Sequence, residues 1–245
     1  MFRLKVLAVA SVAFLGSAMF LHAQDRGQDR GQDRTQPGNQ GLEFKGQVQI
    51  GVHKAKLEAN TLYQVVVGHP QDAPVYVNTD YVMRLATVYS KDFKDNKIYC
   101  VPPKSGEYTF TVSPQVGGTP KSGTIDYTLS LKPMPFDDRL ALDTKGNLTD
   151  KSPKYKNGDK YYEPYKLQMS AGKVYVIDLV KDGVRDPYLY LENAKGDQVA
   201  SDDDGGGDLN ARIIFSPPQD GEYTILASTL GKETGGFKLT VRTVK

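Results

Sequence analysis

The sequence predicts an all-β protein with two tandem, jelly-roll-like β-sandwich domains, preceded by a signal peptide and a disordered linker. Three observations predict this class. The composition favours turns and strands, with 24 Gly, 14 Pro and 15 Tyr but no Trp among 245 residues. From Leu42 onward, short segments of alternating apolar and polar residues are separated by turn-forming residues, without a long segment of helical period. Finally, a series of short motifs occurs twice in the same order.

Residues 1–23 have the pattern of an export signal. Arg3 and Lys5 precede an apolar stretch at residues 6–21, and Ala23 is a small residue at a suitable cleavage position. A retained membrane anchor is the alternative, because the stretch approaches the length that crosses a bilayer. Small and polar residues within it favour cleavage. We therefore expect a secreted, periplasmic or cell-envelope protein with no membrane span after cleavage.

The charge balance argues against a nucleic-acid partner. Lys and Arg total 31 and Asp and Glu total 29, and two of the 31 cations lie in the leader, so the mature chain carries 29 of each. A protein that binds nucleic acid needs surplus cations to displace counterions from phosphates. We expect no nucleic-acid partner.

Residues 24–41 contain the unit Gln-Asp-Arg three times in succession and have almost no apolar side chains. Such a segment cannot bury enough surface to offset the entropy lost on ordering, so we expect a disordered linker.

Residues 42–132 and 138–245 are predicted to be two copies of one domain, joined by a stiff proline linker at 133–137. Four pairs of segments match in the same order, at a spacing of about 110 to 115 residues. The matched pairs begin at Leu57 and Met169, Pro74 and Pro187, Pro102 and Pro217, and Asp126 and Gly236.

Alternation within the repeated Gly-Glu-Tyr segment predicts which side chains face the core. Each strand has one apolar and one polar face, as a two-sheet sandwich requires. The expected inward-facing residues are Tyr108, Phe110 and Val112 in the first copy, and Tyr223, Ile225 and Ala227 in the second.

The second copy resembles the bacterial pre-peptidase C-terminal (PPC) domain family. The resemblance lies in Ala171-Gly172-Lys173-Val174-Tyr175, Asp186-Pro187-Tyr188-Leu189-Tyr190-Leu191, the acidic loop from Ser201 to Gly207, Pro218-Gln219-Asp220-Gly221-Glu222-Tyr223, and Gly236-Phe237-Lys238-Leu239. The first copy is degenerate, with Val88-Tyr89-Ser90-Lys91-Asp92 in place of the acidic loop. The resemblance implies a small β-sandwich that serves a secreted hydrolase as a non-catalytic accessory module. It also implies similarity to the calcium-binding sandwich domains with which bacterial collagenases hold collagen.

The acidic loop is a candidate calcium site. Asp202, Asp203, Asp204 and Asp208 supply carboxylates on a Gly-rich loop, and Asp186 is positioned to join them from the preceding strand. Calcium prefers six to eight oxygen ligands in flexible geometry. The alternative is a solvated acidic loop, because the spacing is not that of an EF-hand.

Residues with catalytic chemistry are few. His53 and His69 are the histidines of the mature chain and lie in no metalloprotease or triad motif, and Cys100 lies in an apolar strand without a basic neighbour. We therefore expect a monomeric, non-catalytic module that binds an extracellular protein or polysaccharide. A secreted hydrolase with an unrecognised carboxylate pair and a purely structural envelope protein are the alternatives.

Residues 154–165 combine tyrosines, amides and charges, as in surfaces that bind peptides or polar polymers. The simpler interpretation is that Tyr161 and Tyr165 begin the first strand of the second copy and fill its core.

Overall fold

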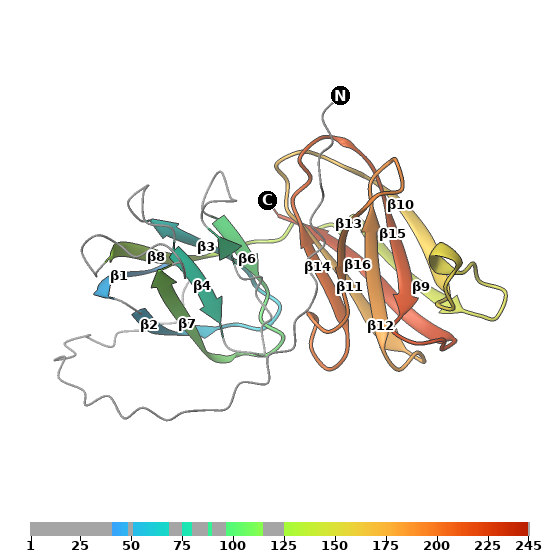
Figure 1. Cartoon of the computed structure of the whole chain (residues 1–245), viewed down its shortest axis with the longest axis horizontal. Helices are drawn as coiled ribbons and strands as arrows, with labels where there is room; N and C mark the ends of the chain where they lie inside the picture. The colour runs from blue at the N-terminus through green and yellow to red at the C-terminus, as the bar shows by residue number, and fades with distance from the viewer. Residues whose placement is uncertain are drawn as a thin grey trace. The chain divides into compact units, whose positions relative to one another are not determined.

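The computed structural model describes residues 41–48, 51–68, 75–79, 88–89, 97–114 and 125–244. These residues form sixteen β-strands and one short 3₁₀ helix, η3 (Tyr155–Asn157), and the strands make four antiparallel four-stranded sheets (Figure 1). The predicted all-β class with two tandem sandwiches is confirmed. The predicted signal peptide lies outside the described residues, as does the predicted linker except for Gly41. No helix in the described residues is long and apolar enough to cross a membrane.

Strands β1 to β8 form the first sandwich, with sheet orders β1-β8-β3-β6 and β2-β7-β4-β5. Their bounds are β1 Leu42–Val48, β2 Gly51–Leu57, β3 Leu62–Gly68, β4 Val75–Thr79, β5 Val88–Tyr89, β6 Lys97–Cys100, β7 Gly106–Pro114 and β8 Ile125–Met134.

Strands β9 to β16 form the second sandwich, with sheet orders β9-β16-β11-β14 and β10-β15-β12-β13. Their bounds are β9 Leu142–Leu148, β10 Tyr162–Met169, β11 Tyr175–Asp182, β12 Pro187–Glu192, β13 Gln198–Asp202, β14 Ala211–Phe215, β15 Gly221–Thr229 and β16 Gly235–Thr243. The two sandwiches therefore have the same topology, with each strand of the second corresponding to the strand numbered eight lower in the first. Eight strands in two sheets of this kind form a jelly roll.

Each sandwich encloses its own apolar core, as the alternation predicts. Tyr108, Phe110 and Val112 of β7 are buried in the first core, and the corresponding three residues of β15 are buried in the second. On β15, Leu226 and Ser228 of the opposite face are also buried. The reason is that chain residues preceding β10 cover this face, where the Ser228 hydroxyl donates a 2.7 Å hydrogen bond to the Tyr161 carbonyl.

The junction between the sandwiches differs from the predicted proline linker at residues 133–137. Pro133 and Met134 are the last residues of β8 and pair with β3. Phe136 then forms a β-bridge with Val244, beside the end of β16. A proline at a strand end removes no ladder hydrogen bond that the sheet needs, so β8 accommodates it. The chain therefore passes from one sandwich to the next while bonded to both.

The start of the second sandwich also differs from the prediction. Its first strand is β9, whereas Tyr161 and Tyr165 belong to the approach and the body of its second strand, β10. Strand β9 lies at a sheet edge, and only Leu148 among its residues is fully buried. Because an edge strand buries few side chains, its sequence carries a weak apolar pattern.

The two sandwiches contact each other through a third apolar cluster. Leu62 and Val101 of the first sandwich pack with Val174 and Val176 of the second, and all four side chains are buried. This cluster lies on the outward face of the sheet that contains β11, so that face is covered rather than solvated.

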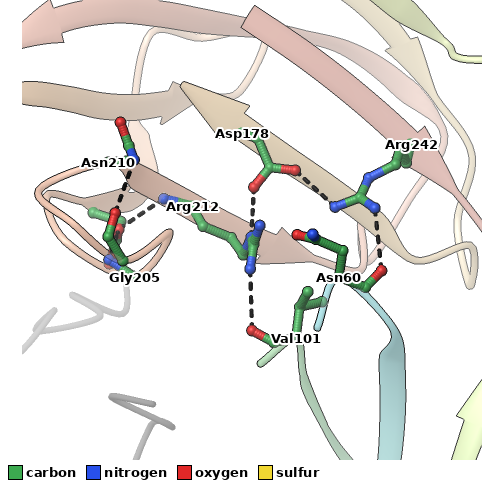
Figure 2. Close-up of polar contacts among 9 residues, drawn as sticks. Asn60, Val101, Asp178, Gly205, Asn210, Arg212 and Arg242 are labelled. Atoms are coloured by element: carbon green, nitrogen blue, oxygen red, sulfur yellow. Dashed lines mark hydrogen bonds and ion pairs between the residues drawn. The ribbon is translucent and has the colours of Figure 1, made fainter. Parts of the chain in front are cut away.

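Three charged residues of the second sandwich, here called the arginine clamp, lie beside this cluster. Asp178 on β11 accepts hydrogen bonds from Arg212 Nε at 2.5 Å and from Arg242 Nη2 at 2.9 Å (Figure 2). Arg212 Nη1 also donates to the Val101 carbonyl at 3.0 Å, and Arg242 Nη1 to the Asn60 carbonyl at 3.3 Å. Each arginine thus joins a carboxylate of the second sandwich to the main chain of the first.

Candidate functional site

The acidic loop joins β13 to β14, and its first carboxylate has a structural role. Asp202 Oδ2 accepts hydrogen bonds from the main-chain N–H groups of Gly205 at 2.7 Å and Arg212 at 2.8 Å. Main-chain hydrogen bonds from Gly206 to the Asn210 carbonyl and from Asn210 to the Gly207 carbonyl close the loop at 2.7 and 2.9 Å. Asp202 therefore holds the loop to β14, and its Oδ2 is already occupied by two donors.

Asp186 directly precedes β12, and the negative charges of two carboxylates of the loop act on it. Burial, followed by the negative charges of Asp204 and Asp203, raises the pKa of Asp186, with a smaller contribution from Glu233. Its Oδ1 atom is buried and has no hydrogen-bond partner among the described residues. A buried carboxylate oxygen without a donor, close to other carboxylates, is an arrangement that a cation would stabilise.

Asp208 points elsewhere, toward the first sandwich. Its carboxylate lies 3.6 Å from Lys104 Nζ, and its carbonyl accepts a 2.8 Å hydrogen bond from Lys181. A Cβ added to the neighbouring Gly207, which has φ +79°, would lie 2.7 Å from Pro103 Cβ. The glycine thus permits both the backbone conformation and the close approach of the Pro103 ring. This end of the loop is part of the contact between the sandwiches.

The five predicted calcium ligands are therefore divided. The charges of Asp203 and Asp204 act on Asp186, whereas Asp202 binds main-chain N–H groups and Asp208 lies near Lys104. In the part of the chain that the structure describes, no group of three or more His, Cys, Asp or Glu side chains has the spacing to hold a metal ion. Calcium binding stays a prediction, and the unpartnered oxygen of Asp186 is the observation that fits it.

A second candidate site, here called the tyrosine surface, comprises Tyr155, Tyr162, Tyr188 and Tyr190. Residues 153–162 form a short hairpin that contains η3. The Tyr155 N–H donates to the Lys160 carbonyl at 2.9 Å and the Tyr162 N–H to the Pro153 carbonyl at 3.0 Å. The hairpin presents Tyr155 to β12, whose Tyr188 and Tyr190 alternate with the buried Leu189 and Leu191 and therefore share the outward face.

The rings of the tyrosine surface form a continuous array. Tyr155 stacks on Tyr190 with centroids 4.1 Å apart and an interplanar angle of 23°, and Tyr190 lies 4.6 Å from Tyr188 at 40°. Tyr162 meets Tyr155 edge-on at 6.2 Å. Tyr190 is the buried member, and burial, followed by the neighbouring Tyr188 and Tyr155, raises its pKa to about 12. The other three rings are half-buried.

Cationic and polar groups border these rings. Lys156 Nζ lies 4.9 Å from the Tyr155 centroid and Lys160 Nζ 4.7 Å from that of Tyr188, both within the range of cation–π attraction. The Tyr155 hydroxyl donates to Gln198 Oε1 at 3.1 Å, which adds an exposed amide from β13 to the rim. The arrangement combines aromatic rings with cationic and hydrogen-bonding groups at their edge.

The segment 154–165, singled out from the sequence, contributes part of this surface. Tyr161 and Tyr165 pack against the second core, as the simpler interpretation predicts, and the Tyr165 ring meets Phe237 edge-on at 6.3 Å. Tyr155 and Tyr162 belong to the surface. Tyr188 and Tyr190 were missed as surface residues, although their alternation with leucines was a signal that both face outward from the core.

The histidine and thiol considered from the sequence have structural surroundings. His53 Nε2 shares a 2.6 Å hydrogen bond with the Tyr127 hydroxyl, and burial lowers the pKa of His53. Cys100 is fully buried in the first core, and burial raises the pKa of its thiol to about 12. A thiol with such a pKa is protonated at neutral pH and a poor nucleophile. His69 lies outside the described residues.

Comparison with known proteins identifies no family for this chain. No family model and no curated protein matches it. Among solved structures, the chain is similar to the M60 catalytic domain with the CBM51-1 and CBM51-2 domains of ZmpB from Clostridium perfringens, with 7% identity and a TM-score of 0.27. The match covers 84% of this chain but only 34% of that one, so this chain spans about a third of that protein's length. A similarity this weak indicates no function.

Proposed function

We propose that this chain is an exported, non-catalytic binding protein that holds an extracellular polysaccharide on its tyrosine surface. The observation that carries the proposal is the array of Tyr155, Tyr190 and Tyr188 on the outward face of a sheet. The inner face of the same sheet packs in the second core, to which none of these three tyrosines belongs.

The chemistry of the surface suits a chain of sugar rings. The C–H faces of a pyranose pack on flat aromatic rings, while its hydroxyls require donors and acceptors around the edge. Gln198 and the Tyr155 hydroxyl supply such groups, and so does Ser201, which lies 3.5 Å from the Tyr188 hydroxyl and accepts from the Gln198 amide at 3.3 Å. Tyrosines also lose little conformational entropy on binding, because each has only two side-chain torsions.

Substitution of Tyr188 tests the proposal. Binding of the mature chain, residues 24–245, to a panel of soluble cell-wall polysaccharides is measured by affinity electrophoresis, with collagen as a protein comparison. Tyr188→Ala should weaken binding to the retained polysaccharide about tenfold, whereas Tyr188→Phe, which keeps the ring, should bind within about twofold of the wild type. Leu140→Ala is the matched control, because Leu140 is an exposed apolar residue outside the tyrosine surface.

Two results would contradict the proposal. One is binding to a polysaccharide that Tyr188→Ala leaves unchanged, because the polymer would then occupy another face. The other is binding to collagen alone, which would make the partner a protein.

We also propose that calcium binds at Asp186, within the negative field of Asp203 and Asp204, and thereby stabilises the second sandwich. The unpartnered Oδ1 of Asp186 supports this, because a cation would supply the missing positive charge. Thermal unfolding with millimolar calcium should give a higher melting temperature than unfolding with chelator, and Asp203→Asn combined with Asp204→Asn should abolish the difference. Asp143→Asn, at an exposed ion pair with Lys238, is the control. Equal melting temperatures with calcium and with chelator would refute this second proposal.

A further inference from the structure

We infer that the polysaccharide held by the tyrosine surface is acidic, and that carboxylate or sulfate groups on its sugar rings bind Lys154, Lys156 and Lys160. This inference rests on the proposed function, because it names the class of ligand for the same surface. The three lysines belong to one hairpin, and each ammonium group lies over a tyrosine ring.

The positions of these ammonium groups favour an anionic ligand over a neutral one. Lys156 lies over Tyr155 and Lys160 over Tyr188, both of them half-buried rings. A neutral pyranose would have to displace both cations before it could stack. An acidic polymer would instead bind the cations where they are, and its hydrogen bonds with them would be charge-assisted.

The lysines are also held before the ligand arrives. A free lysine side chain loses rotamer entropy when it is fixed, and this loss normally weakens an exposed ion pair. Here the rings already restrict Lys154, Lys156 and Lys160, with Nζ to centroid distances of 5.6, 4.9 and 4.7 Å. Less entropy therefore remains to be lost on binding.

The backbone of the hairpin is unusual at one of the three lysines. Lys156 has φ 46° and ψ 46°, the left-handed region that is unfavourable for a residue with a side chain. This conformation occurs within η3, between Tyr155 and the hairpin turn. Strained residues of this kind persist where the surroundings hold them, and they concentrate at binding sites.

Four carboxylates lie in or near the hairpin, and three of them have partners other than its lysines. Asp159 pairs with Lys232 at 2.5 Å, and Glu163 accepts a 2.7 Å hydrogen bond from the Ser152 hydroxyl. Glu192 lies 3.9 Å from Lys156, and only 16% of its side chain is exposed. Asp197 accepts a 3.1 Å hydrogen bond from Asn193. Among the described residues, Glu192 is the one carboxylate in an ion pair with a lysine of this group, so Lys154 and Lys160 have no carboxylate partner there and an acidic ligand can pair with them.

Polymers that differ only in charge test the inference. Binding of the mature chain is measured to polygalacturonate and to its fully methyl-esterified form, and to dextran sulfate and unmodified dextran, at low and at high salt. We expect binding to at least one charged polymer to exceed binding to its neutral counterpart about tenfold or more, and to weaken as salt rises. The two pairs distinguish carboxylate from sulfate recognition.

Charge-neutralising variants locate the interaction. Lys156→Gln combined with Lys160→Gln should reduce binding to the charged polymer about tenfold or more. Lys132→Gln combined with Lys173→Gln is the control, because it removes the same charge from exposed positions outside the hairpin. Equal losses in both double variants would overturn the inference, since binding would then depend only on net charge.

The outcomes separate this inference from the proposed function. Binding to a neutral polymer that depends on Tyr188 but not on the lysines would overturn the inference and leave the proposed function standing. Binding that depends on neither Tyr188 nor the lysines would overturn both. Failure to bind any acidic polymer would also overturn the inference.

Discussion

Replacing Asp178 with Asn removes the negative charge at the centre of the arginine clamp without changing the size of the side chain. The carboxylate accepts hydrogen bonds from Arg212 at 2.5 Å and from Arg242 at 2.9 Å. The exposed side-chain fraction is 9% for Asp178, 8% for Arg212 and 19% for Arg242. The variant therefore leaves two guanidinium groups close together, largely out of water and without a counter-charge.

Removing one partner from a buried ion pair costs about 3 to 5 kcal/mol, because the remaining charge is desolvated and unpaired. We expect Asp178→Asn to lower the free energy of unfolding by about this amount, and the melting temperature by roughly 10 °C. The assay is urea unfolding followed by circular dichroism and tyrosine fluorescence.

The matched control is Asp182→Asn on the same strand. Asp182 Oδ2 accepts from Lys145 at 2.8 Å, and both side chains are more than half exposed. Water replaces such a partner readily, so we expect no resolvable change in the unfolding midpoint. If the two variants are equally stable, the assignment of Asp178 to a buried, water-excluded network is wrong.

A triple variant separates the cost of an unpaired charge from the value of the network. Asp178→Leu combined with Arg212→Met and Arg242→Met replaces the clamp with apolar side chains, a change that is often neutral or stabilising for buried ion networks. It should recover most of the loss caused by Asp178→Asn. The carbonyls of Asn60 and Val101 lose their arginine donors in this variant, so recovery should be incomplete.

Three further predictions concern the cores. Burial lowers the folded-state pKa of His53 below its ordinary 6.5, so lowering the pH through 6.5 protonates the unfolded chain first and should destabilise the protein. His53→Gln should remove this part of the pH dependence in urea titrations between pH 7.5 and 5.5. Parallel plots of unfolding free energy against pH for the two proteins would contradict this prediction. Cys100, with a thiol pKa of about 12, should resist a thiol reagent at pH 8 in native buffer and react in urea, and rapid native reaction would show that it is accessible. Phe237→Ala should cost about 3 to 5 kcal/mol of unfolding free energy, against little change for the exposed Leu230→Ala, and equal midpoints would place Phe237 outside the core.

Local patterns predicted most of the fold. The Gly-Glu-Tyr segments became β7 and β15, and their alternating residues fill the two cores. The prediction was wrong where strands bury little. The edge strand β9 has a weak apolar pattern, and the supposed proline linker is the end of β8, because Pro133 is compatible with a strand end.

The candidate site was less predictable. Asp202, Asp203 and Asp204 are adjacent in sequence, yet Asp202 binds main-chain donors while the other two influence Asp186. Adjacent residues on a loop point in different directions, and only the folded loop determines which carboxylates meet.

The sequence by itself determined the all-β class, the duplication and the inward-facing residues, because strand alternation and repetition are properties of short segments. Only the tertiary structure brought Asp178 to Arg212 and Arg242, which are 34 and 64 residues further along the chain. It likewise stacked Tyr155 of the hairpin on Tyr190 of β12. These contacts depend on strand order and on how the hairpin lies over the sheet, and no local pattern encodes the distance between residues on different strands.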